Sequence, residues 1–91
     1  MIYLDYTANT PADPDVLDAY LAAERRYIAN PNSTHIAGQE ARAEMERVTQ
    51  SIAQHLGVQP AEIIYTSGAS EANNLALKGI AHASRHIGKH I

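Results

Sequence analysis

Apolar and polar residues alternate with a helical period in the first third of the chain. Asp13 and Pro14 open this segment, because an aspartate accepts hydrogen bonds from the free N–H groups at a helix start and proline fits the first helical position. Asn30-Pro31-Asn32 ends it. The pattern therefore predicts a first helix, whose apolar residues are Val16, Leu17, Tyr20, Leu21, Tyr27 and Ile28.

A longer amphipathic segment follows. We expect Ser33 or Thr34 to cap a second helix, which reaches about Leu56 and is closed by Gly57. A coiled-coil seam is an alternative, but the segment is short for one, so the pattern favours ordinary packing against a core. The apolar stripe consists of Ala41, Met45, Val48, Ile52 and Leu56.

The last third of the chain reads as strand, helix and the opening of a strand. Residues 62–66 are nearly continuously apolar, as in a strand buried on both faces. A third helix is expected from about Ala69, through Ala83, until Gly88 breaks it. Residues 88–91 resemble a second strand, and residues 1–4 a further one. Because such strands need parallel neighbours, we expect other chains to complete the sheet or, as favoured, the natural protein to continue past residue 91.

Composition limits the core that this chain can form. Of its 91 residues 45% are apolar, but Phe and Trp are absent and much of the apolar content is alanine. A buried aliphatic side chain contributes only ~1.5–3 kcal/mol, whereas ordering the backbone costs roughly 1–2 kcal/mol per residue. The composition therefore indicates a piece of something larger.

Charge and sequence pattern exclude several classes of protein. The net charge of −3 argues against a nucleic-acid binder, and the lack of cysteine excludes disulfides and thiolate metal sites. The start of the chain lacks the features of a signal peptide, and no stretch approaches the ~20 apolar residues of a membrane span. We expect a cytoplasmic protein that binds neither membranes nor nucleic acid.

The segment from Ile64 to Asn74 carries the clearest candidate site. Gly68 permits close approach of the backbone, and Ala69 and Ser70 lie where the third helix begins. Free N–H groups and the helix dipole at such a point attract a phosphate or a carboxylate, and the Ser70 hydroxyl adds a donor. Alternatively, Ser70 caps its own helix. The spacing of a P-loop is absent.

Three motifs resemble those of cysteine desulfurases, which are class-V aminotransferase-type enzymes of the fold-type I group that depends on pyridoxal phosphate (PLP). Residues 66–74 resemble the segment T-S-G-[AG]-T-E-[SA]-[DN]-N, with Ser70 in place of the usual threonine. Residues 3–11 are similar to the opening Y-L-D-[NY]-x-A-T-T-P, with Asn9 where threonine is usual. Residues 30–35 match the loop G-N-P-S-S-x-H, preceded by Ala29 where glycine is usual.

The resemblance implies a fold and a division of the chain. The whole enzyme would be an α/β protein with a mostly parallel sheet, and residues 1–91 would be one N-terminal fragment of it. This fragment is expected to be mainly helical, with three helices and one or two short strands. Residues 1–57 would form an N-terminal segment with two helices, and residues 58–91 the start of the large PLP-binding domain.

The resemblance also implies a function and site residues. Ala69 and Ser70 would hold the PLP phosphate, and the loop of Ala8, Asn9 and Thr10 would border the substrate. The parent enzyme, a transferase or lyase, would take sulfur from L-cysteine, leaving alanine and an enzyme persulfide, and would serve iron–sulfur cluster assembly. A homodimer is implied, and sulfur-acceptor proteins are possible partners.

No catalytic residue is assigned within this chain. In the family, the lysine that forms the Schiff base with PLP, a ring-stacking histidine, an aspartate at the pyridine nitrogen and a mobile cysteine all lie beyond the position of residue 91. Lys78 and Lys89 are expected to be solvated, so we predict no turnover by the chain alone. His82 and His86 have chelating spacing on one helix face, but a solvated helix end is favoured, and no metal is expected.

Two other functions stay open. The parent could be a selenocysteine lyase or another class-V PLP enzyme, because the residues that discriminate these substrates lie outside the three motifs. The chain could also be a truncated, non-enzymatic helical module that self-associates through its apolar stripes.

Overall fold

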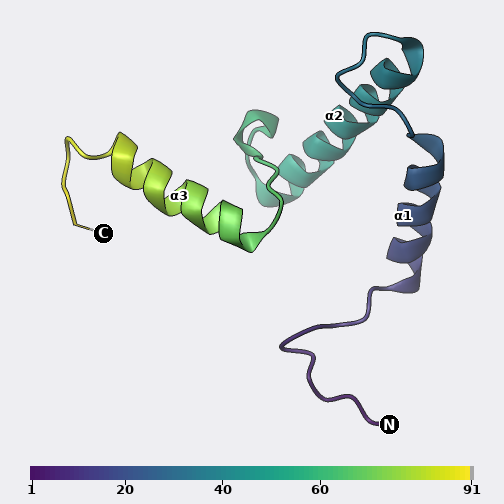
Figure 1. The fold of residues 1–91 in the computed structure, drawn as a ribbon, viewed down its shortest axis with the longest axis horizontal. Coiled ribbons are helices and arrows are strands. Elements are labelled where there is room, and N and C mark those ends of the chain that lie inside the picture. The colour runs from purple at the N-terminus through teal and green to yellow at the C-terminus, as the bar shows by residue number, and fades with distance from the viewer. Residues whose placement is uncertain (91) are drawn as a thin grey trace. The chain divides into compact units, whose positions relative to one another are not determined.

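The computed structural model describes residues 1–90 and contains three α-helices (Figure 1). Helix α1 spans Pro14–Arg26, α2 spans Ile36–Leu56 and α3 spans Ala69–Ala83, and a short 3-10 helix, η1, spans Pro60–Glu62. The chain divides into two units, Met1–Ile52 and the residues from Ala53 onward, and each is described by itself.

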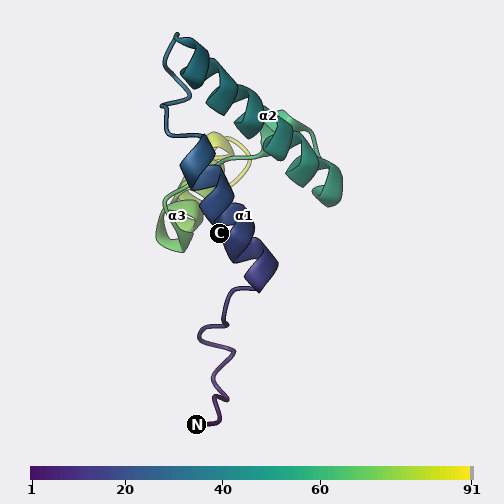
Figure 2. The same ribbon diagram turned by 90° about the vertical axis from the view of Figure 1, so that its right-hand side faces the viewer.

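Helix α1 begins where the sequence predicts. Asp13 is its N-cap, and Oδ1 of Asp13 accepts a hydrogen bond of 2.9 Å from the amide of Asp15. Pro14 is the first helical residue, whose missing N–H costs nothing there. The amide of Tyr27 closes the last turn on the carbonyl of Ala23 at 2.9 Å. Residues 1–13 run into α1 as irregular chain (Figure 2).

Helix α2 begins one to two residues later than Ser33 or Thr34 would place it. His35 directly precedes the helix, and its Nδ1 accepts a hydrogen bond of 3.2 Å from the amide of Gly38. The carbonyl of His35 accepts the first helical bond, from Gln39. The expectation that Ser33 or Thr34 caps α2 is therefore wrong: the backbone of Ser33 belongs to a turn, in which its amide donates to the carbonyl of Asn30 at 2.9 Å.

The loop of residues 30–35 folds against the first turn of α2. Gly38 is buried there, and a Cβ atom on it would lie only 2.5 Å from the carbonyl oxygen of Ser33 and 2.9 Å from that of Asn30. Both are backbone atoms, which have little freedom to move. A glycine at 38 is therefore required by this close approach.

The end of α2 confirms the predicted role of Gly57. Gly57 has a φ of 68°, in the left-handed region that glycine adopts without strain. The amide of Val58 donates to the carbonyl of Ala53 at 3.0 Å, and that of Gly57 to Gln54 at 3.3 Å. These two bonds form the Schellman motif that satisfies the last carbonyls of a helix.

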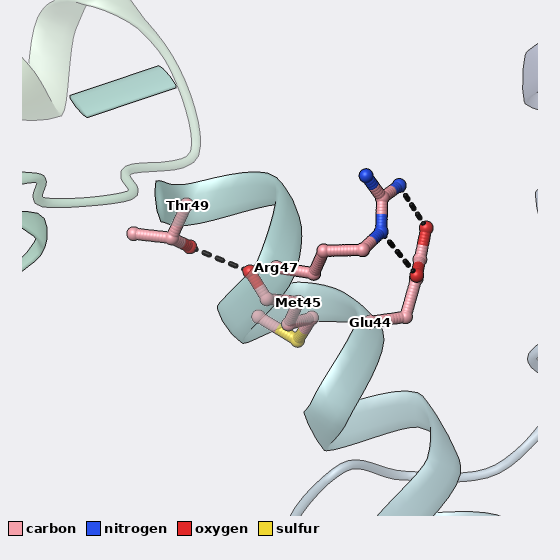
Figure 3. A network of polar contacts seen from close by, with 4 residues as sticks. All are labelled: Glu44, Met45, Arg47 and Thr49. Atoms are coloured by element: carbon pink, nitrogen blue, oxygen red, sulfur yellow. Dashed lines mark hydrogen bonds and ion pairs between the residues drawn. The ribbon is translucent and has the colours of Figure 1, made fainter. Parts of the chain in front are cut away.

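Polar side chains support the middle of α2 (Figure 3). The guanidinium of Arg47 donates to both carboxylate oxygens of Glu44, at 2.6 and 2.8 Å, one turn earlier in the helix. The hydrogen bond from Arg47 lowers the pKa of Glu44. The Thr49 hydroxyl donates to the carbonyl of Met45 at 2.7 Å. These contacts are local to one helix and are exposed.

No strand forms within residues 1–90, which corrects the predicted strands at 1–4 and 62–66. Glu62 lies in η1 instead, and Ile63 follows it with extended angles, φ −86° and ψ 120°. The residues up to Thr66 thus have no regular structure, because a strand exists only when a neighbouring strand pairs with it. The predicted strand at 88–91 reaches residue 91, which lies outside the described residues.

Very little apolar surface is buried. Ala41 and Ala53 are the buried hydrophobic residues of the described chain. The other residues of the α2 stripe stay partly or largely exposed, from 36% at Ile52 to 65% at Leu56. The helical part of the predicted fold is confirmed. The predicted division of the chain at 57/58 stays a prediction. The boundary between the two structural units lies at 52/53, within α2.

Candidate functional site

The N-terminus of α3 presents free hydrogen-bond donors. Gly68 is the N-cap and has no side chain to cap the helix, and the first helical bond runs from the amide of Ala72 to the carbonyl of Gly68 at 3.1 Å. Within residues 1–90 the amides of Ala69 and Ser70 have no hydrogen-bond partner. A helix start in this state carries a partial positive charge.

Ser70 does not cap its own helix. It is the second residue of α3, and its exposed hydroxyl has no hydrogen-bond partner in the described part of the chain. Its carbonyl accepts from the side-chain amide of Asn74 at 2.8 Å, which holds the first turn. The hydroxyl of Ser70 is therefore available to a ligand at the helix start.

Glu71 and Ser67 hold the turn that leads into the helix. The amide of Ser67 donates to Oε2 of Glu71 at 2.9 Å, and the hydroxyl of Ser67 donates to the same oxygen at 2.5 Å. We call these two bonds the Ser67–Glu71 clamp. They hold the pKa of the Glu71 carboxyl below its usual value, with the hydroxyl bond as the larger cause. Glu71 is therefore ionised at neutral pH.

The space in front of Gly68 is open. A Cβ atom on Gly68 would meet no atom within 4 Å, and its φ of 165° is extended backbone that any residue adopts. The Thr66 hydroxyl donates at 3.2 Å to the carbonyl of Gly68, which also accepts the first helical bond from Ala72. Neither packing nor strain within the described chain requires glycine here, and the space in front of it is open.

The donor set suits a phosphate group. Two adjacent amides and one hydroxyl, all without partners within residues 1–90, surround the positive end of a helix. Phosphate oxygens are strong acceptors, and bonds from N–H groups to an ionised acceptor are roughly twice as strong as neutral ones. The chemistry of Ala69 and Ser70 thus fits the phosphate of a cofactor.

The loop of Ala8, Asn9 and Thr10 is organised by Tyr3. The Tyr3 hydroxyl lies 3.0 Å from the carbonyls of both Asp5 and Asn9, and the amides of Ala8 and Asn9 bond to the carbonyl of Asp5. The ring of Tyr3 meets that of Tyr6 edge to face, with centroids 5.4 Å apart. The side chains of the loop remain exposed.

The predicted site residues belong to two different units of the chain. Ala69 and Ser70 share one helix start in the second unit, whereas residues 8–10 belong to the first unit, so each set is described separately. Lys78 and Lys89 are exposed. No group of three or more potential metal ligands occurs within residues 1–90, and no helix there is long and apolar enough to cross a membrane.

The predicted histidine pair does not share a helix. His82 lies in α3, which ends at Ala83, and His86 lies in the turn that follows. In that turn the amide of Ile87 donates to the carbonyl of Ser84 at 2.8 Å. The helical spacing on which a two-histidine site depended is therefore lost.

Known proteins match the chain along its length. Residues 2–91 match the aminotransferase class-V family. The chain belongs to this family. Cysteine desulfurases from Homo sapiens and Rattus norvegicus are each 50% identical over 91 residues, with 99% of this chain and 20% of the relative covered. Cysteine desulfurase IscS from Dictyoglomus turgidum is 42% identical over 90 residues, with 99% of this chain and 23% of the relative covered.

These matches confirm the resemblance that the three motifs indicate, to the cysteine desulfurases among class-V aminotransferases. The chain spans about a fifth of the length of the curated relatives it matches. The activity, cofactor and partners of the whole protein are therefore matters of proposal.

Two polar contacts at helix starts are not predicted from the sequence pattern. The capping role of His35 has no strong signal, because histidine is not a favoured N-cap residue. The Ser67–Glu71 clamp does have a sequence signal. Glu71 is the third residue of α3, the position from which a glutamate commonly reaches back to the helix start.

Proposed function

We propose that this chain supplies the phosphate-binding turn of a PLP-dependent cysteine desulfurase. The parent enzyme takes sulfur from L-cysteine and gives alanine and a persulfide on one of its own cysteines. One observation carries the proposal. The free donors at the start of α3 lie within residues 66–74, the motif segment of a chain that is 50% identical to named cysteine desulfurases.

The amides of Ala69 and Ser70 and the hydroxyl of Ser70 hold the PLP phosphate. The dipole of α3 favours the charge of the phosphate, and Gly68 leaves space for its approach. Bound PLP supplies an electron sink for bond breaking at the α-carbon of the substrate. Ala8, Asn9 and Thr10 border the amino-acid substrate.

No residue of this chain is proposed as catalytic. The Schiff-base lysine and the sulfur-accepting cysteine are proposed to come from other parts of the parent enzyme, since this chain has no cysteine and spans about a fifth of the length of its curated relatives. The parent is proposed to be a cytoplasmic homodimer that passes sulfur to acceptor proteins for iron–sulfur cluster assembly.

A chimera tests the proposal. The 91 residues of this chain replace the matching residues of the human cysteine desulfurase, and PLP absorbance and alanine formation from L-cysteine are measured. We expect the chimera to bind PLP and to form alanine. The Ser70→Ala variant should bind PLP roughly ten- to a hundredfold more weakly, because a hydrogen bond to a charged group contributes about 1.5–3 kcal/mol.

Ser70→Thr is the matched control, because threonine keeps the hydroxyl, and this variant should bind PLP as the unsubstituted chimera does. A folded chimera without PLP absorbance contradicts the proposed cofactor site. So does a Ser70→Ala chimera with unchanged PLP affinity.

A further inference from the structure

Glu71 occupies an unusual place for a carboxylate near a phosphate site. It is the third residue of α3, one position after Ser70, and its carboxylate is bound by the amide and the hydroxyl of Ser67. Two negative groups at one helix start repel each other, so Glu71 is not a phosphate ligand. Its presence there calls for another role.

The clamp removes competition for the free amides. A glutamate at the third position commonly folds back onto the amide of the N-cap residue. Here Oε2 of Glu71 instead reaches one residue further, to the amide and the hydroxyl of Ser67. The carboxylate is thereby occupied, and the amides of Ala69 and Ser70 are left without a partner in the described chain.

The clamp also removes Ser67 as a ligand. Ser67 precedes the helix start closely enough to be a phosphate donor by sequence, but both of its donors point to Oε2 of Glu71. The backbone ahead of Gly68 is fixed by the same two bonds. Glu71 therefore decides which groups at the start of α3 stay free to donate to a phosphate, although Glu71 does not itself contact the phosphate.

We propose that Glu71 is a positioning residue which, through Ser67, orders the turn at 67–68 and keeps the donors of Ala69 and Ser70 free for a phosphate monoester. This inference rests on the proposed function for the identity of the ligand. The clamp itself is a property of the chain without ligand, so the two can fail separately.

The experiment uses the 91-residue chain, labelled with ¹⁵N. Its first readout is hydrogen exchange at the Ser67 amide without ligand. Its second is the change in the Ala69 and Ser70 amide signals when pyridoxine 5′-phosphate is added, since this probe lacks the aldehyde that would react with Lys78 and Lys89. The variants are Glu71→Ala, Glu71→Gln, Ser67→Ala and the double alanine variant, and Glu46→Ala in α2 is the control for lost charge.

Glu71→Ala removes the acceptor of the Ser67 amide, so exchange at this amide should be severalfold faster in the variant. Glu71→Gln keeps an acceptor oxygen and should restore part of the protection. Ser67→Ala should weaken the response of Ala69 and Ser70 to the probe although Ser67 does not bind it. The double variant should bind the probe no more weakly than Ser67→Ala, because the two residues act as one unit. Glu46→Ala should match the wild type.

The positioning role is overturned if the Ser67 amide exchanges at the same rate in the wild type and in Glu71→Ala. It is also overturned if the Cα chemical shifts of residues 72–80 in the wild type are those of a random coil. A protected Ser67 amide with no response of Ala69 and Ser70 to the probe keeps the clamp but contradicts the proposed phosphate site. A response that is equal in Ser67→Ala and the wild type leaves the phosphate site and overturns the inference.

Discussion

At the scale of single residues, polar side chains in this chain act mainly on the backbone at helix starts. Asp13 bonds to the first turn of α1, His35 to that of α2, and Glu71 reaches back from α3 to Ser67. Each contact spans only two to four residues along the sequence. Their energetic effect is therefore local to one turn, where the candidate phosphate donors also lie.

The Ser67–Glu71 clamp should depend on pH. The pKa of Glu71 is lowered in the folded chain from 4.5, so the clamp is complete above pH 4.5 and is lost as the pH falls through the lower folded value. An NMR titration of the Ser67 amide should show a midpoint below 4.5. A midpoint at or above 4.5 contradicts the clamp, and in Ser67→Ala the midpoint of the Glu71 carboxyl should move upward.

His35 should be replaceable by a better capping residue. His35→Ala removes the acceptor for the Gly38 amide and should destabilise the first turn of α2 by about 1 kcal/mol, whereas His35→Asn keeps a side-chain acceptor. Cα chemical shifts of residues 36–40 report the helicity of this turn. Equal shifts in the alanine and asparagine variants would show that the imidazole has no capping role.

At the scale of elements, the same substitution should have opposite effects in two helices. Gly38 in α2 and Gly79 in α3 are both helical glycines, but a Cβ at 38 would lie 2.5 Å from the Ser33 carbonyl oxygen, while one at 79 meets nothing within 4 Å. Alanine exceeds glycine in helix propensity. Helix propensity therefore decides the effect of a glycine-to-alanine substitution only at position 79, whereas at position 38 the close contact decides it.

Gly79→Ala should stabilise α3 by about 0.8–1 kcal/mol and increase its helicity, since only propensity changes there. Gly38→Ala should instead displace the loop of residues 30–35 or unwind the start of α2. Circular dichroism measures the total helicity, and NMR shifts of residues 30–38 locate the change. A rise in helicity in both variants would contradict the close approach at Gly38.

At the scale of the whole molecule, residues 1–90 form helices without a substantial core. Ala41 and Ala53 are the buried hydrophobic residues of this range, and alanine contributes little to the hydrophobic effect. The large apolar residues of all three helices are exposed, among them Leu17 at 50%, Val48 at 38% and Ile80 at 67%. Cooperative folding needs such residues to be buried together.

The isolated chain should therefore unfold gradually. Helices that bury so little apolar surface unfold with weak cooperativity, so ellipticity at 222 nm should fall over a broad temperature range without a sharp midpoint. The measurement is made at two protein concentrations, so that self-association would appear as a shift of the curve. A sharp transition, unchanged between the two concentrations, would show a core that the described structure lacks.

The sequence by itself determined the helices, because helical hydrogen bonds join residues four apart and their signals are local. Asp13-Pro14 marks the start of α1, Gly57 the end of α2, and residues 66–74 together with the N-terminal motif identify the family. Only the tertiary structure decided what depends on neighbours in space. Residues 63–66 form no strand because no partner strand lies beside them within residues 1–90, and Gly38 is required because a loop folds against it. The state of Ser70 was decided in the same way: by sequence Ser70 either caps its own helix or offers its hydroxyl to a ligand, and the structure leaves this hydroxyl free within residues 1–90.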